Sequence, residues 1–105
     1  MPNFDGYPTD EELKFIEDYD VIKDGPIGLI NYLKEIWHWD DYIRFDEGTG
    51  ILEIHCGGWS GNEILIQVLE KTFFWYFYWQ KSFRGGHYFL EIPKRFLEYY
   101  EGKQI

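Results

Sequence analysis

Two histidines, one lysine and one arginine are the side chains of this 105-residue sequence best suited to chemistry on an anion. His55 directly precedes CGGWSGNE, residues 56–63, and His87 directly follows KSFRGG, residues 81–86. One imidazole can accept a proton while a second donates one, and a lysine or arginine stabilises the negative charge that develops. The residues therefore indicate either an anion site or metal-free phosphodiester chemistry.

A helix that begins at Ser60 would add exposed backbone amides to the same region. Ligands of sheets with crossover helices favour the carboxyl ends of strands, and two predicted strands end here. The predicted ligand-binding residues are His55, Gly58, Trp59, Ser60, Lys81, Ser82, Arg84 and His87. A phosphate or a carboxylate is the expected class of ligand.

Each residue of this set also has a purely structural interpretation. Ser60, with Glu63 three positions later, forms a capping-box pattern that starts many helices without a site. Residues 57–58, both glycine, permit a sharp exit from a strand, and no P-loop or dinucleotide fingerprint surrounds them. Trp59 suits either a hydrophobic staple on the helix or an exposed stacking platform. An arginine at a hairpin tip, such as Arg84, is usually solvated. The prediction of a site therefore depends on all these residues lying close together and not on any one of them.

Covalent and metal-based chemistry fit the sequence less well. The two-histidine phosphoesterase pattern needs a hydroxyl two residues after each histidine, whereas Gly57 and Phe89 stand there. Strand alternation points Cys56 opposite to His55, toward the core, which argues against a thiol nucleophile. His55, His87 and a carboxylate lack any recognised metal-ligand spacing. We therefore expect no catalytic residue, no metal and no cofactor.

The elements that must position the site follow from periodicity, caps and turn residues. A capping box at Thr9 and a proline at position 26 start two helices, and glycine-rich turns close two hairpins. The expected elements are helices over 9–18, 26–39, 60–71 and 94–100, and strands over 42–45, 51–56, 72–81 and 87–92. The two hairpins, joined by a crossover helix, predict an α+β fold in the order ααββαββα. Its four-stranded sheet is mostly antiparallel, with one parallel pairing and helices packed on it.

The length and composition fit one domain over residues 1–105, with 45% hydrophobic and 22% aromatic residues to form its core. The inward positions of the first hairpin are expected to be Ile43, Phe45, Leu52, Ile54 and Cys56. Residues 1–8 are expected to be a flexible segment and residues 102–105 a frayed tail. A single cysteine and a polar, acidic start without a secretory signal favour the cytoplasm.

The net charge and its distribution along the sequence limit the classes of partner that this chain can bind. The net charge of -9 argues against direct nucleic-acid binding, which depends on lysine and arginine neutralising phosphates. Residues 1–24 hold eight acidic side chains against two lysines, so a basic protein partner is one expectation. No apolar run approaches the length needed to span a bilayer, and no membrane association is expected.

The aromatic run FFWYFYW, residues 73–79, offers a second interaction surface. As a strand it would be bulky and apolar on both faces. The predicted helices leave one face uncovered, which indicates a homodimer or a partner surface.

GGWSGNE, residues 57–63, followed by WQKSFRGGHY, residues 79–88, resembles a pattern in short uncharacterised proteins encoded by phages and prophage-like regions of bacteria. The pattern is GGWSxNE followed by WxxSxRGGHY, and the similarity covers about residues 50–92. The resemblance implies a mobile-element setting and no particular activity.

These observations together predict a small cytoplasmic, non-enzymatic binding or regulatory protein that acts through a protein partner. The alternative is a small enzyme or sensor that holds a phosphate-bearing metabolite at the edge with His55, Arg84 and His87. The sequence identifies neither the ligand nor the partner.

Overall fold

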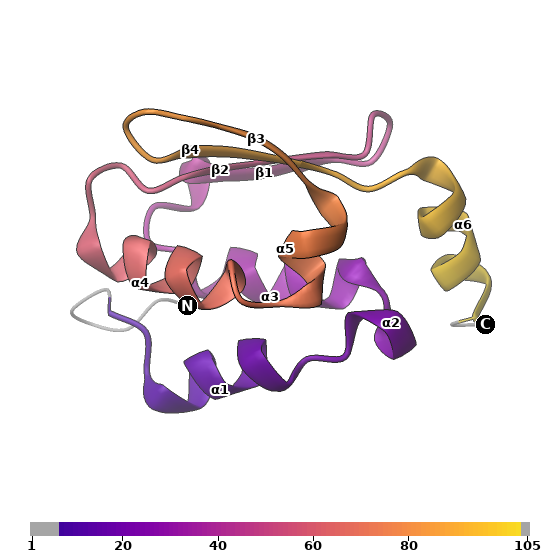
Figure 1. Cartoon of the computed structure of the whole chain (residues 1–105), viewed down its shortest axis with the longest axis horizontal. Helices are drawn as coiled ribbons and strands as arrows, with labels where there is room; N and C mark the ends of the chain where they lie inside the picture. Colours follow the sequence, from indigo (N-terminus) through magenta and orange to yellow (C-terminus); the bar gives the residue numbers. More distant parts are fainter. Residues whose placement is uncertain (1–6, 104–105) are drawn as a thin grey trace.

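The computed structural model describes residues 7–103, which form a four-stranded sheet with helices on one side (Figure 1). In chain order the elements are α1 Asp10–Asp18, α2 Val21–Asp24, α3 Pro26–Ile36, a 3-10 turn Asp40–Tyr42, β1 Ile43–Asp46, β2 Ile51–His55, α4 Ser60–Leu69, α5 Phe73–Tyr78, β3 Trp79–Phe83, β4 His87–Glu91 and α6 Lys94–Lys103. The predicted α+β class is confirmed, and two short helices, α2 and α5, are added to the predicted order. Of the predicted flexible segment 1–8, residues 1–6 lie outside the described residues, as do residues 104–105 of the predicted tail.

The strand order is β1-β2-β4-β3, and each neighbouring pair is antiparallel. The expected parallel pairing of the second and third strands is therefore wrong, because β4 lies between β2 and β3. Leu90 of β4 is fully buried at this central position, whereas every residue of β3 is exposed, as suits an edge strand. β2 and β3 still run in the same direction, since each is antiparallel to β4.

The core lies between the helices and the one sheet face that they cover (Figure 1). Leu52 and Ile54 of β2 point into it and are completely buried, as period-two alternation predicts. From the helices, Ile30 and Leu33 of α3 and Leu65 of α4 meet them. Within residues 7–103, no helix covers the opposite sheet face, called here the outer face (Figure 1).

The predicted strand over residues 72–81 is wrong for its first part, because residues 73–78 form α5. The Thr72 hydroxyl accepts a hydrogen bond from the Trp75 amide, 3.3 Å, and donates one to the Leu69 carbonyl, 2.6 Å. Phe74 and Tyr78, one helical turn apart, are both buried. An all-aromatic run has strand propensity and no polar positions to reveal a period of 3.6, so the sequence pattern favoured a strand.

The ends of the other helices differ from prediction by a few residues. Thr9 caps α1 as predicted: its hydroxyl accepts from the Glu12 amide, and its amide donates to the Glu12 carboxylate. α3 ends at Ile36, before the predicted end at residue 39. α6 continues to Lys103, so residues 102–103 of the predicted tail are helical. Among the described residues, no helix is both long and apolar enough to cross a membrane.

Candidate functional site

The predicted convergence of the second hairpin turn with the end of β2 is confirmed. His55 of β2 and His87 of β4 are paired across the two strands, and Phe83 of β3 pairs with His87. The Cys56 amide donates to the Gly86 carbonyl at 2.9 Å, which fastens the β3–β4 turn to the loop leading into α4. The turn and the start of α4 therefore share one edge of the sheet (Figure 1).

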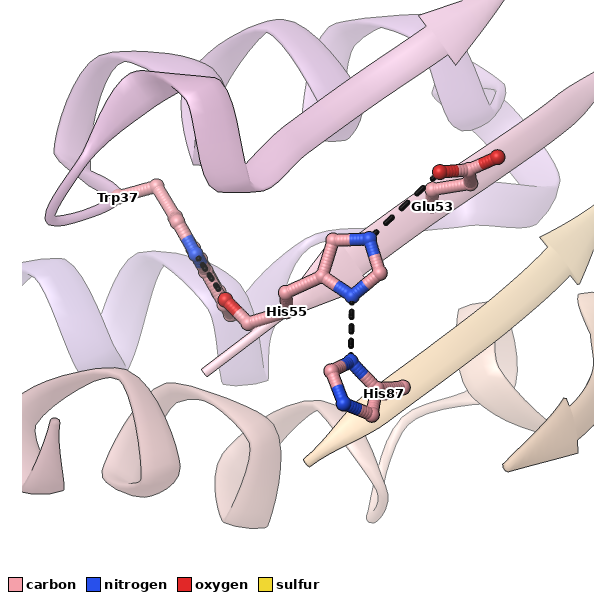
Figure 2. Close-up of polar contacts among 4 residues, drawn as sticks. All are labelled: Trp37, Glu53, His55 and His87. Carbon is pink, nitrogen blue, oxygen red and sulfur yellow. Dashed lines mark hydrogen bonds and ion pairs between the residues drawn. The ribbon is translucent and has the colours of Figure 1, made fainter. Parts of the chain in front are cut away.

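The two imidazoles touch on the outer face (Figure 2). The Nδ1 atoms of His55 and His87 are 2.7 Å apart, so one ring donates a hydrogen bond and the other accepts it. Nε2 of His55 lies 3.5 Å from the Glu53 carboxylate on the same strand face. The Trp37 indole donates to the backbone carbonyl of His55 at 3.0 Å, which anchors the end of β2 to α3.

Lys81 lies on the same outer face, where it pairs with Phe89 across β3 and β4. Its ammonium stands 5.2 Å from the centre of the Phe89 ring and 5.6 Å from that of Phe83. This is cation-π geometry. The face also carries Glu53 and Glu91, so the cation does not stand in a uniformly positive field.

Of the remaining predicted site residues, Ser60 and Trp59 at the start of α4 have structural contacts of their own. Ser60 is the first residue of α4, and the N-cap position is taken by Trp59, with no side-chain cap bond. The predicted capping box is therefore wrong, and the Ser60 hydroxyl is 2.6 Å from the Tyr7 hydroxyl instead. The Trp59 ring stacks on His38 with centroids 4.9 Å apart. Gly58 adopts a positive φ of 74°, with open space where a side chain would stand.

Ser82 and Arg84 complete the predicted set. The Ser82 hydroxyl accepts a hydrogen bond from the Trp79 indole at 2.8 Å. Strand alternation places Ser82 opposite in sense to Lys81. Arg84 is exposed in the β3–β4 turn. The structure thus brings His55, His87 and Lys81 onto the outer face. Gly58, Trp59 and Ser60 lie at the start of α4 and are not part of that face.

Gly57 holds a tight passage between β2 and α4. Its φ is +62°, and a side chain there would collide with the Tyr42 and Trp39 rings. Trp39 itself has φ +62°, a conformation rare for a bulky residue. Backbone conformation and close packing therefore require a glycine at position 57, without any role in ligand binding.

Cys56 is 2% exposed, as the strand pattern predicts, and burial raises the pKa of its thiol to about 11. At neutral pH the sulfur is therefore protonated and a poor nucleophile. We expect a thiol reagent such as dithiobis(nitrobenzoate), at pH 8, to label the native chain at least about a hundredfold more slowly than the urea-unfolded chain. Equal labelling rates in the two states would contradict this assignment.

Asn62 belongs to the GGWSxNE pattern but was not among the predicted site residues, and its structural role was not predicted. It is fully buried; its amide oxygen accepts from the His38 amide at 3.0 Å, and its nitrogen donates to the His38 and Cys56 carbonyls at 3.0 and 3.3 Å. It therefore ties the end of α3 and the end of β2 to α4. A polar residue at i-3 and i-4 from the buried Leu65 and Ile66 was the available signal.

A second unpredicted feature is a groove between α2, α5 and α6, called here the aromatic groove. It encloses about 430 Å³, and its lining residues are Val21, Ile22, Phe77, Tyr78, Phe96 and Tyr100. The Tyr100 hydroxyl donates to the Ile22 carbonyl at 2.6 Å, which fixes α6 to α2. Burial raises the pKa of the Tyr78 hydroxyl to about 12, so it stays neutral at physiological pH.

Comparison with known proteins finds no matching family model, no matching curated protein and no matching solved structure.

Proposed function

We propose that this chain is a small, non-enzymatic binding protein that captures a basic, amphipathic segment of a protein partner in the aromatic groove. The observation that carries the proposal is the apolar lining of the groove and its continuity with the exposed aromatic side of α5. Phe77 belongs to both surfaces and is 48% exposed. A cytoplasmic, mobile-element setting is part of this proposal and rests on the sequence alone.

The exposed aromatic side of α5 supports a partner surface. Phe73 is 66% exposed and Tyr76 80%, and Phe73 stacks on Phe77 with centroids 5.9 Å apart. Ile22 and Phe96 add exposed apolar surface on the neighbouring helices. Contiguous exposed apolar patches on small proteins commonly mark interaction sites. An apolar helix face that inserts every third or fourth side chain suits such a groove.

Charge around the groove favours a basic partner. Asp18 at the end of α1 and Asp24 at the end of α2 are exposed near the groove. Lys23 of α2 and Arg95 of α6, which lies over the Phe96 ring, partly offset them. α2, which lines the groove, is capped by Asp20. Lysines and arginines on the polar side of a partner helix would meet this acidic surface. The same acidity opposes a second copy of the chain at this face, since like charges would approach one another.

The proposal is tested with a synthetic 18-residue helical peptide that carries leucine on one face and lysine on the other. We expect saturable binding to the full-length chain by calorimetry, weakening steeply as salt rises from 50 to 300 mM because screening shortens electrostatic range to about 8 Å or less. The control is the same peptide with glutamate for each lysine, which should bind at least about tenfold more weakly. Equal binding of the two peptides, or none, would contradict the proposal.

The oligomeric state in solution distinguishes binding of a basic partner from the homodimer that the sequence also predicted. Analytical ultracentrifugation at micromolar concentration should show a monomer if the groove serves a basic partner. A dimer that Phe77→Ala converts to monomer would instead assign the groove to a second copy.

The alternative, a phosphate-bearing ligand at the outer face, is favoured by the position of Lys81 on the same face as the two imidazoles. Glu53 and Glu91 on the same face oppose an anion there. Phosphodiester hydrolysis abolished by His87→Ala would support this alternative over a binding protein.

A further inference from the structure

The contact between His55 and His87 joins residues 32 positions apart in sequence. Strand pairing places them directly opposite one another, and both side chains rise from the uncovered face of the sheet (Figure 2). Their Nδ1 atoms, 2.7 Å apart, converge on one point. This point lies apart from the aromatic groove, whose lining comes from α2, α5 and α6.

The Glu53 carboxylate, 3.5 Å from Nε2 of His55, favours a proton on that nitrogen. With its proton on Nε2, toward the Glu53 carboxylate at 3.5 Å, His55 presents a lone pair at Nδ1. His87 then donates its Nδ1 proton to that lone pair. If His87 carries its proton on Nε2 instead, both Nδ1 lone pairs point at the same space, and a cation can replace the proton.

We propose that His55 and His87 form a two-imidazole chelate for a divalent transition-metal ion, with Cu²⁺ bound more tightly than Zn²⁺. Imidazole nitrogens bind such ions at about 2.0 to 2.1 Å, so two of them at right angles around one ion stand about 2.9 Å apart. The Nδ1 atoms need to separate by only about 0.2 Å to reach that spacing, and the two rings need to rotate so that each lone pair points at the ion and not at the other nitrogen. Imidazole suits copper and zinc, and tetragonal Cu²⁺ accepts two nitrogens at right angles.

The Glu53 carboxylate strengthens the chelate from outside it. A histidine that ligates a metal commonly donates its other ring N–H to a carboxylate, which fixes the ring and makes it a better ligand. Within residues 7–103, no group of three or more histidine, cysteine, aspartate or glutamate side chains is arranged to hold a metal. The chelate therefore uses two protein ligands, and solvent completes the coordination.

The test titrates Cu²⁺ into the untagged full-length chain by calorimetry, with glycine as a weak competitor. We expect one Cu²⁺ per chain and at least about tenfold weaker binding in His55→Ala and in His87→Ala, because each leaves a single imidazole. Glu53→Gln should weaken binding by about tenfold while both ligands stay in place. Zn²⁺ should bind more weakly than Cu²⁺ in every folded form.

His38→Ala is the matched control, since His38 is the one histidine of the sequence outside the proposed pair. It should leave Cu²⁺ affinity unchanged, and circular dichroism identifies variants that remain folded. His87→Gln replaces His87→Ala if the alanine variant does not fold. Electron paramagnetic resonance of the Cu²⁺ complex should show two imidazole nitrogens. Absent binding, unchanged affinity in both ligand variants, or a single bound imidazole would overturn the chelate.

Discussion

Asn62→Asp should lower the free energy of unfolding by at least about 3 kcal/mol, and the melting temperature by roughly 10 to 20 °C, because it removes two buried donors and introduces a buried charge. The aspartate keeps the shape of the side chain and can still accept from the His38 amide. It cannot donate to the carbonyls of His38 and Cys56, which then lie unpaired inside the protein. The variant therefore separates hydrogen bonding from packing.

Asn31→Asp is the control for this substitution. Asn31 lies on α3 and is exposed, so the same chemical change there should alter stability by no more than about 0.5 kcal/mol. Urea denaturation followed by far-ultraviolet circular dichroism measures both variants. Similar losses at the two positions would show that Asn62 does not hold α3, β2 and α4 together.

Phe77→Ala should weaken capture of the basic peptide by about thirtyfold, corresponding to roughly 2 kcal/mol, the loss typical of an aromatic anchor in a binding site. Phe77 connects the aromatic groove with the exposed side of α5, where it stacks on Phe73. Because Phe77 is half exposed, its truncation removes partner contacts at little cost to the core.

Phe83→Ala controls for the general loss of an exposed aromatic ring. Phe83 is 56% exposed, a fraction similar to that of Phe77, but it lies on β3 and does not line the groove. Its truncation should change peptide affinity less than twofold. Calorimetry with both variants checks the contrast, and equal losses would indicate nonspecific hydrophobic adsorption.

Sequence patterns predicted well wherever neighbouring residues decide the structure. The alternation at Leu52 and Ile54 identified the buried strand face, and the Thr9 capping box marked the start of α1. Ser60 carries a similar pattern and was predicted to be the N-cap of α4. The Glu63 amide instead donates a hydrogen bond to the Trp59 carbonyl, so Trp59 is the N-cap and Ser60 the first helical residue. A local pattern thus fails where the chain has another partner available.

The remaining features depend on contacts between distant segments. The edge that gathers His55 and His87 was predictable, because it follows from strand direction. Their direct pairing was not, since it requires β4 to lie beside β2. The aromatic groove depends on residues 73–78 folding as a helix, which uniform aromatic composition concealed. Its other wall, α6, is fixed by the bond from Tyr100 to α2.

The most direct test of the central claim is an ¹H–¹⁵N NMR titration of the full-length chain with the basic amphipathic peptide. We expect amide shifts to concentrate at Ile22, Phe77 and Phe96 and on the acidic α1–α2 segment, with the outer-face residues His55 and His87 unchanged. Shifts confined to the outer face, or no saturable shifts at the aromatic groove, would contradict that claim.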